Sequence, residues 1–199
     1  MGFYDGDWPS GQHHHLPATA PCGGIPKGQT FITSSWSRNN DNASPPRIKA
    51  SANYLNSRLA GLEAKRQGAG GAVILNPDGT ISEGPGGCLF LMRDDVFLTP
   101  DVNSGILESI TRKTILELGA EIGVEMVERP IGRTEMYIAE EAFYCGTGQE
   151  IGPVTAFDGR PVGSGKPGPV TRRLQAEFDG IVRGNNPDHE FWRTRVYKD

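Results

Sequence analysis

The chain has 199 residues, of which 36% are hydrophobic and 22% are charged, and its formal net charge is -4 at pH 7. This length and composition suit one large or two small soluble domains with a buried core. The small negative charge gives no reason to expect nucleic acid or an anionic membrane as a partner, and no apolar run approaches the roughly 20 residues of a membrane span. Because the first residues lack the basic and apolar parts of a secretory signal, we expect a cytoplasmic protein.

Residues 1–29 are rich in Gly, Pro and polar residues and show neither a helical nor a strand period, so we predict an irregular segment there. His13–His15 suggest a metal site, but no spaced acidic or cysteine partner follows, and a loop is the better interpretation. The three cysteines are widely spaced and form no CxxC pattern, which argues against a disulfide framework or a zinc site. They are Cys22, Cys88 and Cys145.

From Thr30 onward, apolar clusters alternate with helical stretches and turn signals, as in an α/β domain that we place over residues 30–184, with a tail over 185–199. The first predicted helix begins after Lys49, and Ser51 is its expected cap. Three leucines at helical spacing are expected to form its buried face, and two glycines are expected to end it. These residues are Leu55, Leu59 and Leu62, then Gly68 and Gly70.

A hairpin is predicted next, with strands over 72–75 and 80–82 around the turn at Pro77–Gly79, which places Glu83 at the exit of the second strand. The later patterns predict five strands and three helices. The strands are expected over 88–92, 96–99, 125–130, 142–145 and 154–157, and the helices over 111–122, after Thr134, and over 169–182 before Gly184.

Lys49 and Glu83 are the residue types that a pyridoxal phosphate site needs most. An amine forms a Schiff base with the cofactor aldehyde, and a carboxylate keeps its pyridine ring protonated. The predicted elements place the lysine before a helix and the glutamate at a strand end, so that both could face one cleft. Each residue alone is more often a solvated surface side chain, and the segments that follow decide the interpretation.

Two glycine-containing segments fit the binding of a phosphate. Within Gly105–Arg112 a turn leads directly into a helix, whose first backbone N–H groups and Thr111 hydroxyl could hold an anion. The stretch Gly146–Gln149 places a second hydroxyl between glycines at a strand end. The second signal is weak by itself, and an ordinary strand-end hydroxyl is its simpler interpretation.

Several segments together resemble the class IV pyridoxal phosphate aminotransferases in order and spacing, and among these the branched-chain amino acid aminotransferases most. The similarity extends over roughly residues 30–184, and its joint pattern is specific. The segments are 34–38, 49–55, 78–84, 105–107 with 110–112, 146–147 and 165–171. This resemblance implies an α/β fold of type IV, in which a mixed sheet or pseudo-barrel with surrounding helices forms the large carboxy-terminal, cofactor-binding domain.

The resemblance also implies a role for each matching residue. Lys49 would form the Schiff base and then move a proton between the substrate Cα and the cofactor C4′. Glu83 would pair with the pyridine nitrogen, and Tyr54 would hydrogen-bond the phenolic oxygen of the cofactor. The other implied contacts are Leu107 with the ring, Ile110, Thr111 and Thr147 with the phosphate, and Thr147 and Gly148 with the substrate.

Three departures from the family pattern accompany this similarity. Cys88 stands where the family has an Asn, and Gly148-Gln149 stand where it prefers two alanines, so the side-chain preference is left open. The family also has a smaller amino-terminal domain ahead of the segment that begins near Thr30. The 29 residues found there do not resemble it, so we expect a cofactor-binding domain without that partner and with weak or absent activity.

The leading hypothesis is a homodimer that uses pyridoxal 5′-phosphate to move the amino group of leucine, isoleucine or valine to 2-oxoglutarate. Within the same fold, an aminodeoxychorismate lyase or a D-amino acid transaminase stays open. The third hypothesis is a non-catalytic truncated paralogue that keeps the packing of the domain and binds no cofactor.

Overall fold

A computed structural model of the chain describes residues 28–194, so His13–His15, Cys22 and almost all of the predicted irregular segment lie outside the described residues. Within that range there are eight strands and three α-helices. The strands are β1 (Gln29–Ser37), β2 (Gly71–Leu75), β3 (Cys88–Arg93), β4 (Val96–Thr99), β5 (Met126–Glu128), β6 (Glu141–Gly146), β7 (Glu150–Phe157) and β8 (Arg160–Pro161). The helices are α1 (Tyr54–Arg66), α2 (Ile110–Glu121) and α3 (Pro169–Arg183), with short 3-10 turns at Ser51–Asn53, Val102–Ser104, Arg133–Ile138 and Pro187–Trp192.

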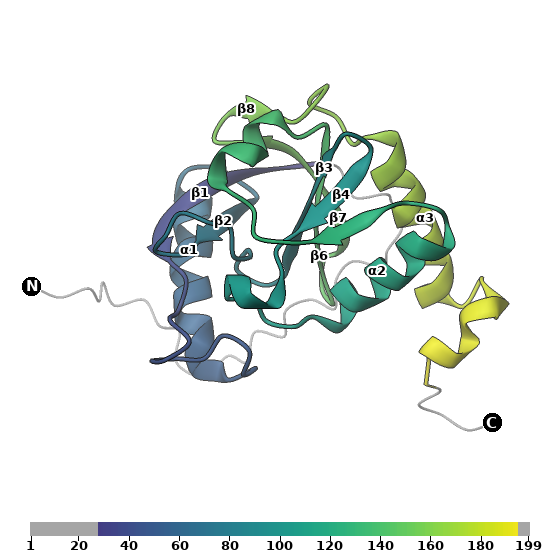
Figure 1. The fold of residues 1–199 in the computed structure, drawn as a ribbon, viewed down its shortest axis with the longest axis horizontal. Coiled ribbons are helices and arrows are strands. Elements are labelled where there is room, and N and C mark those ends of the chain that lie inside the picture. The colour runs from purple at the N-terminus through teal and green to yellow at the C-terminus, as the bar shows by residue number, and fades with distance from the viewer. Residues whose placement is uncertain (1–27, 195–199) are drawn as a thin grey trace, which may run out of the picture.

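The strands form one mixed sheet in the order β2-β1-β7-β6-β3-β4-β5, and β8 pairs with β7 (Figure 1). Strand β1 runs parallel to both β2 and β7, and β4 runs parallel to β5. The pairs β7–β6, β6–β3 and β3–β4 are antiparallel. This architecture agrees with the α/β class and the mixed sheet that the sequence predicts.

Both faces of the sheet are buried, because successive side chains of a strand point to opposite faces. In β3, Leu89 and Leu91 join a core cluster with Phe31 of β1 and Val73 of β2. The intervening Phe90 belongs to a second cluster, which contains side chains of α2 and α3. A strand covered on both faces has no polar side, which explains why β3 is apolar without alternation.

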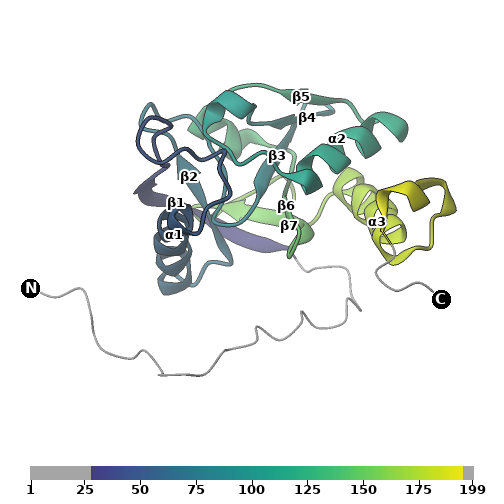
Figure 2. The same cartoon turned by 90° about the horizontal axis from the view of Figure 1, so that it is seen from below.

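The helices cover different parts of the sheet (Figure 2). Helix α1 contacts β1 and β2, whereas α2 and α3 contact one another and lie against β6 and β7. Between these two groups of helices, the segments that precede α1 and α2 approach each other. The site described below is built on these segments.

Helix α1 differs from the sequence prediction at its start and on its buried face. It begins at Tyr54 after a 3-10 turn, and no side-chain cap is formed by Ser51. Its buried positions are Ser57, Ala60 and Ala64, whereas Leu55 is 64% exposed. Small side chains let the helix approach β2 closely, and this close contact, rather than hydrophobicity, selects the inner face. The predicted leucine face is therefore wrong.

Most of the other predicted elements agree with the structure within a few residues. The predicted second hairpin strand over 80–82 is reduced to isolated bridges at Thr80 and Ile81, and the helix predicted after Thr134 is the 3-10 turn Arg133–Ile138. The turn of the hairpin is closed by hydrogen bonds from Asn76 N to Thr80 O (2.8 Å) and from Ser82 N to Ile74 O (3.0 Å). Gly184 ends α3 in the left-handed conformation, with φ of 81°. Strand β1 had no counterpart among the predicted elements, because its sequence alternates poorly between apolar and polar residues.

Two further sequence-based expectations concern the domain division and membrane spans. The division into residues 1–29, 30–184 and 185–199 stays a prediction. Among the helices of the described residues, none is sufficiently long and apolar to cross a membrane.

Candidate active site

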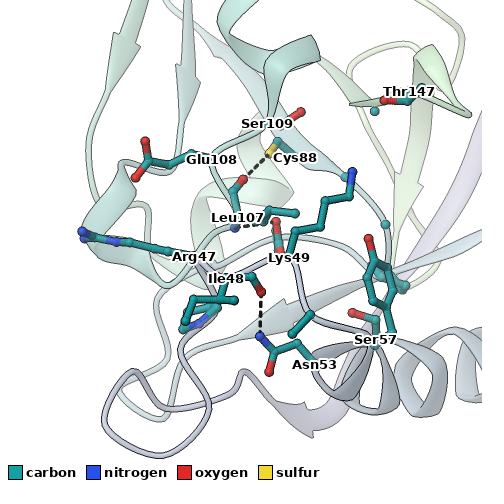
Figure 3. A pocket seen from close by; sticks show the side chains of 18 of the residues that line it. Arg47, Ile48, Lys49, Asn53, Ser57, Cys88, Leu107, Glu108, Ser109 and Thr147 are labelled. Atoms are coloured by element: carbon teal, nitrogen blue, oxygen red, sulfur yellow. Dashed lines mark hydrogen bonds between the residues drawn. The ribbon is translucent and has the colours of Figure 1, made fainter.

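A cavity of about 470 Å³ opens between α1, α2 and the sheet, and we call it the lysine pocket. Its walls come from segments that are far apart in the sequence. The lining residues are Arg38, which follows β1, and residues 46–50, 53–54, 57, 83, 85–88, 107–110 and 146–148. Figure 3 shows the Lys49 side chain extended into this space between Leu107 and Thr147.

The segment that presents Lys49 is held by one buried amide side chain. Asn53 Nδ2 donates hydrogen bonds to Pro45 O (2.8 Å) and Ile48 O (2.9 Å), and its Oδ1 accepts a bond from the Ser44 hydroxyl. Figure 3 shows the contact with Ile48. Because these bonds fix the backbone on the amino-terminal side of Lys49, the lysine stem starts from a defined position although its side chain is exposed.

Glu83 is the buried carboxylate of the lysine pocket, with only 5% of the residue exposed. Its Oε1 forms an ion pair with Arg38 Nη2, and its Oε2 accepts a hydrogen bond from Leu107 N (3.1 Å). Arg38 is itself 5% exposed and donates from Nε to Gly105 O (2.9 Å). The carboxylate is thus held by two other segments, and each of its oxygens keeps acceptor capacity for a ligand.

Burial raises the pKa of Glu83 to about 7, and the charge of Arg38 and the Leu107 amide oppose this rise. Desolvation disfavours the charged carboxylate more strongly than these two groups favour it. A carboxyl group with this pKa can change its protonation state near neutral pH. Such perturbed groups in a cavity are typical of functional sites.

One wall of the lysine pocket is made by glycine-rich backbone at Gly86, Gly87 and Gly146. The Tyr144 hydroxyl, inside the sheet, accepts a hydrogen bond from Gly86 N (2.6 Å). A Cβ at Gly87 would lie 2.1 Å from Cys145 O, and a Cβ at Gly146 would lie 2.8 Å from Gly86 O. Only glycine allows the two backbone segments to approach this closely, which keeps this wall of the lysine pocket free of side chains.

Helix α2 begins at the edge of the lysine pocket. Ser109 is its N-cap and accepts a hydrogen bond at Oγ from Arg112 N (3.2 Å). Ile110 and Thr111 supply the first two amides of the helix, ahead of the Arg112 amide that donates to Ser109. A helix N-terminus with amides at its open end is suited to an anion such as a phosphate group.

The structure brings most of the predicted site residues to one cavity. Seven of the eight line the lysine pocket, and they are Lys49, Tyr54, Glu83, Leu107, Ile110, Thr147 and Gly148. Thr111 is not among the described residues that line it, because its side chain is buried within the first turn of α2. The backbone amide of Thr111 still lies at the helix N-terminus. The functional role of each of the eight residues stays a prediction.

Cys88 also lines the lysine pocket, at the position where the resemblance to class IV aminotransferases implies an Asn. It is 1% exposed, and its Sγ lies 3.8 Å from Leu107 O (Figure 3). Burial and the nearby Glu83 raise its pKa to about 12, so this side chain is a neutral thiol at physiological pH. This protonation state argues against a nucleophilic cysteine and agrees with a small buried thiol.

Sequence reasoning missed three residues that shape the site. Arg38 pairs with Glu83, Asn53 fixes the lysine segment, and Tyr144 anchors the glycine wall. A buried carboxylate needs a partner, but nothing in the sequence shows which arginine provides it. Arg38 directly follows β1, and without that strand its position beside Glu83 could not be predicted.

The residues of this site belong to a recognisable family pattern. The sequence profile described as "Amino-transferase class IV" matches residues 12–157, well over half of the chain. The chain belongs to the class IV aminotransferases. The match begins upstream of Thr30, where the sequence pattern had placed the start of the domain.

Among its class IV relatives, the branched-chain-amino-acid aminotransferase of Pseudomonas aeruginosa is 45% identical over 172 residues, which are 86% of this chain and 56% of that protein. The enzyme of the same name from Escherichia coli is 41% identical, over the same 86% of this chain and 56% of its own length. The chain therefore spans about half the length of the relatives that it matches.

Solved structures of class IV aminotransferases confirm the fold. The branched-chain amino acid aminotransferase of Thermobaculum terrenum in its PLP-form superposes with a TM-score of 0.83 at 45% identity, over 86% of this chain and 56% of that one. The branched-chain aminotransferase of the archaeon Thermoproteus uzoniensis, solved with norvaline, gives a TM-score of 0.82 at 37% identity, over 86% and 57%. The fold of type IV, expected from the sequence, is confirmed.

Proposed function

We propose that this chain binds pyridoxal 5′-phosphate in the lysine pocket and transaminates branched-chain amino acids with 2-oxoglutarate. One observation supports the proposal most: the exposed Lys49 amine and the buried Glu83 carboxylate belong to the same cavity. The relatives named branched-chain-amino-acid aminotransferase, at 41–45% identity, support the substrate class.

The residues of the lysine pocket fit this cofactor in three respects. Its volume, about 470 Å³, lies in the range of pockets that hold small ligands. Glu83 has acceptor capacity for a protonated ring nitrogen, and the N-terminus of α2 offers amides to a phosphate. Lys49 reaches the space between these two groups, where an aldehyde could meet its amine (Figure 3).

Pyridoxal phosphate, when bound, supplies an aldehyde for amine exchange and a ring that withdraws electrons from the substrate Cα. In our proposal, Lys49 holds the cofactor and afterwards moves a proton between the substrate Cα and the cofactor C4′. Glu83 keeps a proton on the ring nitrogen. Tyr54 donates to the phenolic oxygen, Leu107 packs on the ring, and the helix end at Ile110 and Thr111 orients the phosphate. Thr147 and Gly148 contact the phosphate and the substrate carboxylate.

The cofactor part of the proposal is tested by mixing the purified chain with pyridoxal phosphate and recording the yellow absorbance of the lysine-bound cofactor. We expect this band in the unmutated chain and its loss in Lys49→Ala. Lys65→Ala is the matched control, since Lys65 is an exposed lysine in the last turn of α1. An unmutated chain without the band would contradict cofactor binding, and a band that persists in Lys49→Ala would contradict the role of Lys49.

The substrate part is tested with amino acid and oxo acid pairs assayed one at a time. We expect leucine, isoleucine and valine to react with 2-oxoglutarate. Pyruvate release from aminodeoxychorismate alone would identify a lyase, and turnover of D-amino acids alone would identify a D-amino acid transaminase. The chain spans about half of the relatives' length, so the assay measures what this polypeptide does by itself.

A homodimer in the cytoplasm is the remaining part of the proposal. Several apolar side chains are exposed on the side of the lysine pocket, among them Ile48 (58%), Tyr54 (45%) and Ile110 (85%). Exposed apolar groups at a pocket mouth favour contact with another protein surface. Sedimentation of the purified chain at several concentrations tests the dimer, and a single monomeric species at every concentration would contradict it.

A further inference from the structure

The Arg38–Glu83 pair affects where a proton lies when a ligand nitrogen binds at Glu83. A carboxyl group and a ring nitrogen that share one proton can hold it on either atom. If the proton stays on the carboxyl oxygen, the ring is neutral at its nitrogen and withdraws electrons poorly. If it stays on the nitrogen, the carboxylate is ionised and the ring is cationic. The groups around Glu83 decide between these two arrangements.

We propose that Arg38 is a positioning residue that favours the ionised form of Glu83 inside the protein, so that the proton shared with the cofactor lies on the ring nitrogen. The statement about the ring nitrogen rests on the proposed function, whereas the effect of Arg38 on Glu83 does not. The Glu83 O–H bond breaks and the ring N–H bond forms as the proton moves to the nitrogen, and the charge of Arg38 balances the resulting carboxylate.

The geometry supports a dedicated role for this arginine. Arg38 is fixed at both ends, because its backbone N donates to Leu75 O (2.8 Å) and its Nε donates to Gly105 O (2.9 Å). The Ser82 hydroxyl also donates to Gly105 O (3.0 Å), which holds that carbonyl in place. These hydrogen bonds hold the guanidinium in place, and its Nη2 is directed at Glu83.

The other groups that face Glu83 cannot replace this charge. Cys88 and Tyr144 lie close enough for Glu83 to influence their pKa values, and burial raises both, so each is neutral at physiological pH. Leu107 contributes a neutral backbone amide. Lys49 lines the same pocket, but its amine is not among the groups that shift the pKa of Glu83. Burial alone raises the pKa of Glu83, which leaves Arg38 as the permanent charge that lowers it.

The first experiment needs no cofactor. The chain is labelled with carboxyl-¹³C glutamate, and the midpoint of the Glu83 signal is followed by NMR against pH, with Glu83→Gln assigning the signal. We expect a midpoint near 7 in the unmutated chain. In Arg38→Met and Arg38→Gln the midpoint should rise by about one pH unit or more, because the opposite charge is lost. Arg38→Lys keeps the charge and should titrate closer to the unmutated chain.

Arg129→Met is the matched control, since Arg129 forms a two-contact pair with Glu135 (2.6 and 3.1 Å) that lies outside the lysine pocket. In this variant the Glu135 signal should move and the Glu83 signal should not. An unchanged Glu83 midpoint in either neutral Arg38 variant would overturn the proposal. This result is independent of whether the chain binds pyridoxal phosphate.

The second experiment uses pyridoxal phosphate labelled with ¹⁵N in the ring. At pH 8 we expect the nitrogen signal of a protonated ring in the unmutated chain and of an unprotonated ring in Arg38→Met. Equal signals in the two proteins would overturn the statement about the ring. If the unmutated chain does not bind the labelled cofactor, the proposed function fails, and the carboxyl titration still decides what Arg38 does to Glu83.

Discussion

Single residues decide the charge inside the lysine pocket, and Glu83 is the most sensitive of them. It is buried, it pairs with one arginine, and its pKa of about 7 lies far above the ordinary carboxyl value. A group whose pKa differs between the folded and unfolded chain makes stability depend on pH. Glu83 thus connects the electrostatics of the pocket to a measurement on the whole protein.

We predict that the free energy of unfolding falls with rising pH because of Glu83. Its pKa is about 7 in the folded chain and near 4.5 in the unfolded one, so the folded state binds the proton more tightly. This contribution is complete below about pH 4.5 and is lost as the pH rises through about 7. The difference corresponds to about 3 kcal/mol. Urea unfolding between about pH 4.5 and 8 measures it, with the non-titrating Glu83→Gln as reference. Parallel curves for the two proteins would refute the prediction.

The residue scale also shows what sequence can and cannot give for the site. Lys49 and Glu83 were found because their neighbours stand in register with a family pattern. The pairing of Arg38 with Glu83 could not be found, since 45 residues separate them and the pairing depends on how β1 and the hairpin lie in space. For Thr111 the sequence indicated the correct position but the wrong group. Its side chain is buried, and only its backbone amide lies at the helix N-terminus, where it could bind an anion.

At the scale of secondary-structure elements, strong local signals gave correct predictions and weak ones failed. Helix α3 has Pro169 at its start and Gly184 at its end, two residues whose backbone preferences fix helix boundaries. The start of helix α1 has no proline and no side-chain cap. Its leucines were assigned to the core on hydrophobic spacing, whereas its buried positions are Ser57, Ala60 and Ala64, and the two alanines pack against Ala72 and Ile74 of β2. Periodicity reports hydrophobicity and cannot report how closely two elements approach.

The inner face of α1 can be tested by two opposite substitutions. Ala60 is fully buried against the sheet, so Ala60→Leu should overfill the contact and lower the free energy of unfolding by about 1–3 kcal/mol. Leu55 is 64% exposed, so Leu55→Ala should change it by less than about 0.5 kcal/mol. Urea unfolding measures both. If Leu55→Ala proved the more damaging change, the leucine face would be the buried one after all.

The start of α3 depends on a carboxylate from another element. Glu141 of β6 accepts hydrogen bonds from Val170 N (3.1 Å) and Thr171 N (2.7 Å), while the N-cap Gly168 has no side chain to do so. We expect Glu141→Ala to lower the free energy of unfolding by about 1–2 kcal/mol, because the helix loses its cap and the favourable charge at its N-terminus. Glu117→Ala, at an exposed position on α2, is the control and should have little effect. Equal effects of the two changes would show that Glu141 is not a cap.

At the scale of the whole molecule, the lysine pocket joins parts of the fold that otherwise touch little. Lys49 precedes α1, Glu83 follows the hairpin of β2, and Ile110 begins α2. Helices α1 and α2 lie on different parts of the sheet and do not cover one another (Figure 1). A ligand that contacts all three segments would therefore add a link between the two sides of the domain.

We predict that pyridoxal phosphate stabilises the chain against urea. A ligand that binds only the folded state adds about 2.7 kcal/mol to the free energy of unfolding at 100 times its dissociation constant. Pyridoxine 5′-phosphate keeps the ring nitrogen and the phosphate but lacks the aldehyde, so it should bind through Glu83 and the α2 N-terminus alone and stabilise less at the same concentration. In Lys49→Ala the two ligands should become nearly equivalent, because only the amine distinguishes them. A stabilisation by pyridoxal phosphate that Lys49→Ala leaves unchanged would place the aldehyde elsewhere, and no stabilisation by either ligand would contradict a cofactor site in this pocket.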